Sequence, residues 1–158
     1  MYIYEAGCLT HYHRNNEMNK AIEWRNKLDK WANNNNVETY NPAKTFLKEV
    51  NHTYDPRACV DQNEYYLSRC DIMIVNLDDI DFSPGSIYEL VRFKDMRKPV
   101  IAFGTKHWSP HINSCISNHC EDGIEGVIEL LINMFDQGNL YSIKQNKTKK
   151  ERNKTHEK

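Results

Sequence analysis

The 158-residue sequence has no apolar run approaching the roughly 18–20 residues that a membrane-spanning helix needs. Its longest apolar stretches, within residues 71–77 and 99–103, have the length of buried strands. The N-terminus lacks the basic region and apolar stretch with which a secretory signal begins. We therefore expect a cytoplasmic protein that does not contact a membrane.

The sequence patterns of several cofactor and metal sites are also missing. Neither G-x-G-x-x-G nor G-x-x-x-x-G-K-[ST] occurs, which removes the main support for a dinucleotide or P-loop site. The five cysteines include no C-x-x-C pair, so we expect reduced and mostly buried thiols. His107, His111, Cys115 and His119 recur at every fourth residue, but Pro110 interrupts any continuous helix through them. We expect neither a metal nor an organic cofactor.

Basic residues are concentrated at the C-terminus instead of being spread over the chain. Residues 143–158 carry seven Lys or Arg and two Glu, although the net charge of the whole chain is −1. A nucleic-acid-binding domain would distribute basic groups over one face, so we expect no nucleic-acid partner. Length and composition favour one globular domain over residues 1–138, followed by a basic, disordered tail over 139–158.

Apolar periodicity predicts alternating strands and helices. Strands are expected at residues 1–6, 37–40, 71–77 and 99–104, with a weak fifth at 116–120, and helices at 17–33, 61–69, 85–96 and 123–135. Residues 43–60 show no decisive pattern. This alternation predicts an α/β fold, a single-domain three-layer sandwich with a parallel sheet of four or five strands, flavodoxin-like or Rossmann-like.

Ligands of such sheets bind beyond the carboxyl ends of the strands, where the segment after residue 77 stands out. Asp78, Asp79 and Asp81 follow a buried strand, Gly85-Ser86 opens a helix, and Glu89 lies about one turn inside it. The positive end of a helix keeps a nearby carboxylate ionised, as a nucleophile must be. Two structural alternatives stay open: Glu89 stabilises the helix dipole, and the aspartates form a solvated turn.

Six short segments follow one another along residues 1–137: IYEAG at 3–7, WRxxL at 24–28, YNP at 40–42, CDIMIVNLD at 70–78, GSxxEL at 85–90 and KPVIA at 98–102. In this order they resemble the nucleoside 2-deoxyribosyltransferase superfamily, including its nucleotide N-hydrolase branch. In that family, the glutamate of the G-[ST]-x-x-E helix attacks the anomeric carbon of a nucleoside. The base leaves, and water or a second base then takes the sugar from a glycosyl–enzyme ester.

The resemblance implies roles for residues that match the motifs. Glu89 matches the nucleophile, and Tyr4 matches a tyrosine that orients it. Gly7 and Gly85-Ser86 match backbone positions that approach the sugar or its 5′ substituent. Asn41, after the second strand, is a further candidate for substrate binding.

One position departs from the family pattern. The family commonly has an aspartate eight residues before Asp71, which helps to protonate or hold the leaving base, but Asn63 stands there in this chain. Asparagine hydrogen-bonds a base edge but supplies no titratable proton. Asp78 or Asp81, which match an acidic loop contacting sugar or base, would then take over, or the acid step is weak, or the protein binds without turnover.

The expected function is cleavage or exchange of the N-glycosidic bond of a (2′-deoxy)nucleoside or nucleotide. Two alternatives remain: a glycohydrolase of NAD or a signalling nucleotide, and a non-catalytic nucleotide-binding protein. The resemblance also implies a homodimer or larger homo-oligomer, because sites of this family often borrow residues from a neighbouring subunit.

Overall fold

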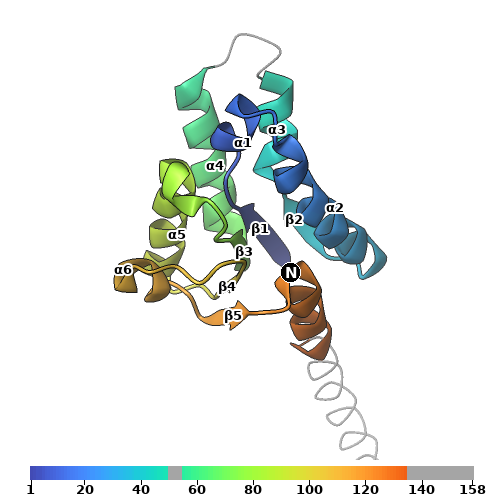
Figure 1. Ribbon diagram of the computed structural model, residues 1–158. Helices are drawn as coiled ribbons and strands as arrows, with labels where there is room; N and C mark the ends of the chain where they lie inside the picture. The colour runs from blue at the N-terminus through green and yellow to red at the C-terminus, as the bar shows by residue number, and fades with distance from the viewer. Residues whose placement is uncertain (50–54, 135–158) are drawn as a thin grey trace, which may run out of the picture. The chain divides into compact units, whose positions relative to one another are not determined.

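The computed structural model describes residues 1–49 and 55–134, so the expected tail at 139–158 lies outside the described residues. One five-stranded sheet organises the chain (Figure 1). Its strands are β1 (Tyr2–Ala6), β2 (Glu38–Tyr40), β3 (Ile72–Asn76), β4 (Val100–Phe103) and β5 (Asn118–Cys120). They pair in the order β2-β1-β3-β4-β5, and every pairing is parallel. The parallel sheet predicted from the sequence is confirmed, including its weak fifth strand.

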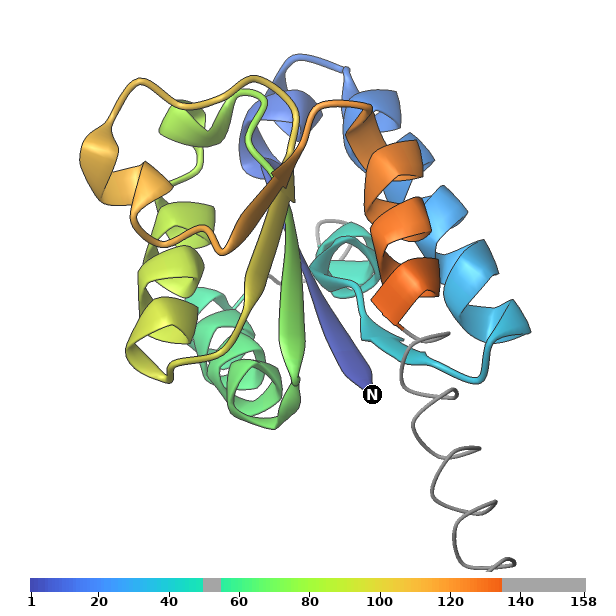
Figure 2. The same cartoon turned by 90° about the horizontal axis from the view of Figure 1, so that it is seen from below.

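Helices connect these strands. They are α1 (Thr10–Arg14), α2 (Met18–Asn34), α3 (Pro42–Glu49), α4 (Pro56–Arg69), the 3₁₀ turn η1 (Ile80–Phe82), α5 (Pro84–Asp95), α6 (Pro110–Asn113) and a helix over residues 123–134. Figure 2 shows α4 and α5 on one face of the sheet and α2 on the other. The expected three-layer sandwich is therefore confirmed. The chain forms two compact units, residues 1–127 and 128–158, and all the labelled elements belong to the first.

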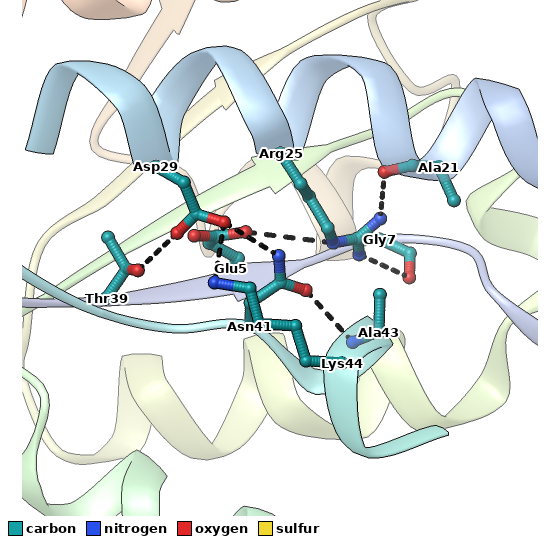
Figure 3. Close-up of polar contacts among 9 residues, drawn as sticks. All are labelled: Glu5, Gly7, Ala21, Arg25, Asp29, Thr39, Asn41, Ala43 and Lys44. Carbon is teal, nitrogen blue, oxygen red and sulfur yellow. Dashed lines mark hydrogen bonds and ion pairs between the residues drawn. The ribbon is translucent and has the colours of Figure 1, made fainter. Parts of the chain in front are cut away.

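Strand composition explains which strands lie at the centre. All five residues of β3 are buried, as expected for a β-branched, apolar strand covered on both faces. Along β1 the side chains alternate: Tyr4 and Ala6 join the apolar cluster that includes Leu67 of α4 and Leu90 of α5. Glu5 points the other way, toward α2 (Figure 3).

Two helices begin at Asx-Pro pairs, and the second pair, Asp55-Pro56, lies within the segment that apolar periodicity left unassigned. Asp55 caps α4, because its Oδ1 accepts hydrogen bonds from the backbone N–H groups of Arg57 at 3.0 Å and Ala58 at 3.4 Å. Pro56 occupies the first helical position, where its missing N–H is no loss. This cap extends the helix expected at 61–69 back to residue 56.

The cysteine side chains are mostly buried, as expected from the sequence. All five cysteines are thiols; Cys8, Cys70 and Cys115 are buried, while Cys59 and Cys120 are partly buried. Among residues 1–49 and 55–134, no helix combines the length and apolar character needed to cross a bilayer.

Gly104, just after β4, lies close to the side chains that follow β3, and a substitution there tests how tightly they pack. Its φ is +86°, and a Cβ added there would meet Asn76 Oδ1 at 2.6 Å and Asp78 Oδ1 at 2.9 Å. We expect Gly104→Ala to lower the free energy of unfolding by about 2 kcal/mol through backbone strain and this close approach. Denaturant unfolding measures the change.

Gly85→Ala is the matched control, because nothing lies within 4 Å of an added Cβ at this helical position. It should raise stability by roughly 0.5–1 kcal/mol. Equal stability of the two variants would contradict the packing described around Gly104.

Candidate active site

The Glu89 carboxyl group lies where three elements meet. Glu89 is in the second turn of α5 and only 8% exposed. Its Oε1 accepts a hydrogen bond of 2.8 Å from the Tyr4 hydroxyl of β1 and one of 3.0 Å from Asn63 Nδ2 of α4. Tyr4 therefore contacts this glutamate as the resemblance implies, and Asn63, which was expected to contact the leaving base, also contacts it.

The two oxygens of Glu89 are in different environments. Both hydrogen bonds reach Oε1, whereas no donor in the described part of the chain reaches Oε2. One oxygen is thus held by a phenol and an amide, and the other keeps its electron pairs available. This is the arrangement that a carboxylate nucleophile requires.

A layer of tyrosines holds these two donors in place. The Tyr40 hydroxyl donates to Asn63 Oδ1 at 2.8 Å, which leaves Asn63 Nδ2 directed at Glu89. The Tyr4 and Tyr40 rings have centroids 5.3 Å apart, and Tyr66 stacks on Tyr40 at 3.9 Å. Burial raises the pKa of Tyr4 far above its usual range, so its hydroxyl stays neutral and donates.

Burial raises the pKa of Glu89 to about 7. The Tyr4 and Asn63 hydrogen bonds and the positive charge of Arg25 act against burial, while the negative charge of Glu64 adds to it. Near neutral pH the carboxyl group is therefore divided between its acid and anionic forms, as is common for working groups of active sites.

A cavity of about 360 Å³ opens beside Glu89, where Gly7 follows β1, Pro42 follows β2 and α5 begins. Ligands of such sheets bind beyond the carboxyl ends of the strands. Five residues that the sequence singled out line it: Gly7, Asn63, Gly85, Ser86 and Glu89. Its volume is in the range of small-molecule sites.

Other lining residues were not predicted. Thr10 and Arg14 come from α1, a five-residue helix too short to show periodicity. Arg14 is the one Lys or Arg among the described lining residues. Ser83, whose Oγ lies 2.8 Å from Ser86 Oγ, precedes Pro84 at the start of α5. That Ser-Pro pair is a helix-start signal that was present in the sequence.

Asp78 and Asp81 do not lie in the lining of the Glu89 cavity. They line a separate hollow of about 650 Å³. Asp78 Oδ1 accepts a hydrogen bond of 2.8 Å from the Thr105 backbone N–H, which ties the end of β3 to the loop after β4. Asp81 Oδ1 is 2.8 Å from His107 Nε2, and the hydrogen bond with His107 lowers the pKa of Asp81.

Asn41 is also absent from the residues that line the Glu89 cavity, and its side chain instead makes hydrogen bonds within the fold. Its Oδ1 accepts from the Ala43 backbone N–H at 3.0 Å, at the start of α3, and its Nδ2 donates to Asp29 at 3.3 Å. The structure therefore gathers Glu89, Tyr4, Gly7, Asn63 and Gly85-Ser86, but neither the two aspartates nor Asn41.

The histidines and cysteines after β4 do not converge on one point. His107 Nδ1 accepts from the Ser109 backbone N–H at 3.0 Å, which leaves Nε2 as the donor to Asp81. His119 Nε2 lies 3.0 Å from the Gly104 carbonyl oxygen. Within the described residues, no three His, Cys, Asp or Glu side chains form a group that would hold a metal ion.

Sequence comparison finds neither a matching family model nor a matching curated protein. Comparison with solved structures finds the CMP N-glycosidase BcmB of Clostridium botulinum, at 11% identity and a TM-score of 0.57, covering 85% of this chain and 99% of that one. It also finds a 2-deoxyribosyltransferase of Bacillus psychrosaccharolyticus, at 16% identity and a TM-score of 0.59, covering 81% and 90%.

The chain shares the fold of this N-glycosidase and this deoxyribosyltransferase. The resemblance carried by the sequence motifs is thus confirmed at the level of the fold, although the identities are low.

The raised pKa of Glu89 predicts a pH-dependent effect of Glu89→Gln on stability. Glutamine retains an acceptor oxygen for Tyr4 and Asn63 but never ionises. Because the folded pKa of about 7 exceeds the usual value of 4.5, the wild-type loses stability as pH rises through this interval. Glu89→Gln should therefore become more stable than wild-type by up to about 3 kcal/mol at pH 9, and should match it near pH 4.

Denaturant unfolding at several pH values measures the difference. Glu23→Gln, at an exposed position of α2, is the control and should follow the wild-type profile. A difference between Glu89→Gln and wild-type that does not change with pH would contradict the burial described for Glu89.

Proposed function

We propose that this protein cleaves or exchanges the N-glycosidic bond of a nucleoside or nucleotide, with Glu89 as the nucleophile. The observation that carries the proposal is the asymmetry of the buried Glu89 carboxylate, whose Oε1 is held by Tyr4 and Asn63. Its Oε2 has no described donor, and the cavity beside it has the size of a small-molecule site.

The structural neighbours support the same class of chemistry. One is a CMP N-glycosidase and the other a 2-deoxyribosyltransferase, so both are enzymes of nucleoside or nucleotide chemistry. Fold alone does not select an activity. The proposal therefore depends on the Glu89 geometry, and the neighbours narrow the class of substrate.

In the proposed reaction, Glu89 Oε2 attacks the anomeric carbon while the C–N bond to the base breaks. The bond electrons leave with the base, and an ester joins the sugar to Glu89. Tyr4 and Asn63 keep their hydrogen bonds to Oε1 and so hold the carboxylate plane through the step. Water completes hydrolysis by displacing Glu89, whereas a second base completes transfer.

The leaving base needs a proton, and the residues that the resemblance suggested for this step do not supply it. Asn63 does not titrate, and Asp78 and Asp81 are engaged in the other hollow. We propose that the base takes its proton from solvent. Bases that leave readily as anions should then be released fastest.

Arg14 is the residue that we expect to contact a 5′ substituent of the substrate. It is the one basic side chain among the described lining residues, and Ser83 and Ser86 line the same cavity. A 5′-phosphate would find a counter-charge and hydroxyl donors there. The assay must therefore compare nucleosides with their 5′-monophosphates.

The decisive assay incubates the protein with ribonucleosides, deoxyribonucleosides, their 5′-monophosphates and NAD, each with and without an added acceptor base. Chromatography follows free base and new nucleosides. We expect base release or exchange on part of this panel, and a loss of more than about a thousandfold in Glu89→Gln because the nucleophile is gone.

Glu23→Gln is the control, since Glu23 is an exposed carboxylate of α2 that lies beside Lys27. It should retain activity. Base release from NAD alone would favour the glycohydrolase alternative. Absence of turnover on every substrate, with ligand binding still seen as a thermal shift, would overturn the enzyme proposal in favour of a binding protein.

Asn63→Asp tests the departure from the family pattern. A carboxylate in place of the amide, whose nitrogen now lies 3.0 Å from Glu89 Oε1, would repel the ionised form and raise the pKa of Glu89 above about 7. We expect turnover at pH 7 to fall several-fold and the acidic limb of the pH–rate profile to move to higher pH.

Asn63→Ala separates the lost hydrogen bond from the added charge, and should shift the acidic limb less. A strong gain in turnover for Asn63→Asp at pH 7 would contradict this account. It would show that an acid is missing from the native site.

A further inference from the structure

The hollow of about 650 Å³ described above borders the Glu89 cavity, and we call it the Trp108 hollow. Residues 76–82 and 105–108, which follow β3 and β4, supply most of its lining. Phe82 lines both the Trp108 hollow and the Glu89 cavity, so the two share a wall. The hollow is therefore placed to receive the part of a ligand that extends out of the Glu89 cavity.

The shared wall is an aromatic stack. The Phe82 ring lies on the His11 ring of α1, with centroids 4.5 Å apart and planes inclined by 12°. The same helix borders both spaces, because Tyr12 lines the Trp108 hollow and Arg14 lines the Glu89 cavity. Phe82 is nevertheless 60% exposed, which leaves an apolar surface at the boundary for a ligand to cover.

Trp108 is a second exposed aromatic residue of the hollow, and the residue before it is firmly held. Trp108 is 81% exposed, whereas His107 is buried. His107 Nε2 lies 2.8 Å from Asp81 Oδ1, and the His107 carbonyl oxygen accepts a hydrogen bond of 2.7 Å from Asn113 Nδ2. An anchored loop thus presents a tryptophan ring to solvent, and exposed rings of this kind are surfaces on which nucleobases stack.

The polar lining of the Trp108 hollow suits hydroxyl donors better than anions. Its described side chains include more acids than bases: Asp78, Asp79 and Asp81 against Lys20 and Lys106. The fold engages one oxygen of Asp78 through the Thr105 backbone N–H, and one oxygen of Asp79 through the Tyr12 hydroxyl at 2.9 Å. The second oxygen of each can accept from a ligand, as carboxylates accept from ribose hydroxyls in dinucleotide sites.

Positive charge and hydroxyl donors lie on the other side of the Phe82 wall. Arg14 is the basic residue of the described Glu89 cavity lining, and Ser83 and Ser86 add two hydroxyl groups. The chain lacks the glycine-rich turn by which many dinucleotide-binding domains hold a diphosphate on backbone N–H groups. A guanidinium and two hydroxyls offer a diphosphate charge-assisted hydrogen bonds instead.

The asparagine at position 63 narrows the class of leaving base. Asn63 Nδ2 donates to Glu89 and its Oδ1 accepts from Tyr40, so both polar atoms of the amide already have partners within the site. A base attached through a pyridinium nitrogen leaves as a neutral molecule, because the electron pair of the broken C–N bond cancels the charge of the ring. Its departure needs no acid, whereas the bases of ordinary nucleosides need a proton.

We propose that the Glu89 cavity and the Trp108 hollow together bind one dinucleotide, in which a diphosphate joins a pyridinium nucleoside to a second nucleoside. The pyridinium nucleoside lies against Glu89, the diphosphate near Arg14, and the second base on Trp108. Glu89 Oε2 bonds to the anomeric carbon while the C–N bond breaks toward the ring nitrogen. Water then displaces Glu89 and gives up one proton to solvent. This inference names the substrate class for the function proposed above and rests on it.

Three substrates that share one leaving base test the role of the Trp108 hollow: NAD, nicotinamide mononucleotide and nicotinamide riboside. Release of nicotinamide is followed by chromatography. We expect kcat/KM for NAD to exceed that for the mononucleotide by at least about tenfold, because the mononucleotide has no second base to stack on Trp108. The riboside, which also lacks the phosphate that Arg14 would hold, should be the poorest of the three.

Two substitutions of Trp108 examine the stacking surface itself. Trp108→Ala should reduce the ratio of kcat/KM for NAD to that for the mononucleotide to near one, whereas Trp108→Phe should retain most of it, because phenylalanine keeps an aromatic face. Ile132→Ala is the control, since Ile132 is an exposed apolar residue outside the lining of both hollows. A wild-type ratio near one, or a ratio that Trp108→Ala leaves unchanged, would overturn the proposal.

Binding to the Glu89→Gln variant separates a failure of this inference from a failure of the proposed function, because calorimetry needs no turnover. We expect NAD to bind about tenfold more tightly than the mononucleotide, and this difference to vanish when Trp108→Ala is added. Tighter binding of NAD without base release by the wild-type would remove the proposed activity alone. Base release from nucleosides, with equal binding of NAD and the mononucleotide, would remove this inference alone.

Discussion

The contact of Tyr4 and Asn63 with a single oxygen of Glu89 is the interaction on which the rest of the site depends. It joins the inner strand β1 to the helices α4 and α5, which come from distant parts of the chain. Because both donors reach Oε1, the carboxylate plane is set while Oε2 stays open. The tyrosine layer formed by Tyr40 and Tyr66 gives this contact its rigidity, since Tyr40 orients the Asn63 amide.

Burial and ionisation oppose each other at this carboxylate. The low-dielectric surroundings that strengthen the two hydrogen bonds also disfavour the anion, and the pKa of Glu89 rises to about 7 as a result. On the other face of β1, Arg25 is a buried cation whose Nη2 donates to the Gly7 carbonyl oxygen.

The segment after β3 serves two different purposes along its length. Its first part ties β3 to the loop after β4, through Asp78 and the Thr105 backbone, and pairs Asp81 with His107. Its second part, from Ser83 to Glu89, turns into α5 and lines the Glu89 cavity. The polar residues of this loop therefore divide between two hollows, with Phe82 on the boundary because it lines both.

Local pattern was enough to predict the parallel sheet and the Gly85–Glu89 helix start, because strand and helix periods and turn residues act over a few positions. The same pattern missed α1, which is too short to be periodic, and the start of α4, where the Asp55 cap decides. Three features of the site appear only in the tertiary structure. Asp78 and Asp81 line a different hollow from Glu89. Asn63 pairs with Tyr40, and Arg25 donates a hydrogen bond to the Gly7 carbonyl oxygen. They join residues tens of positions apart, and no local preference of the chain encodes which side chains meet across a folded sheet.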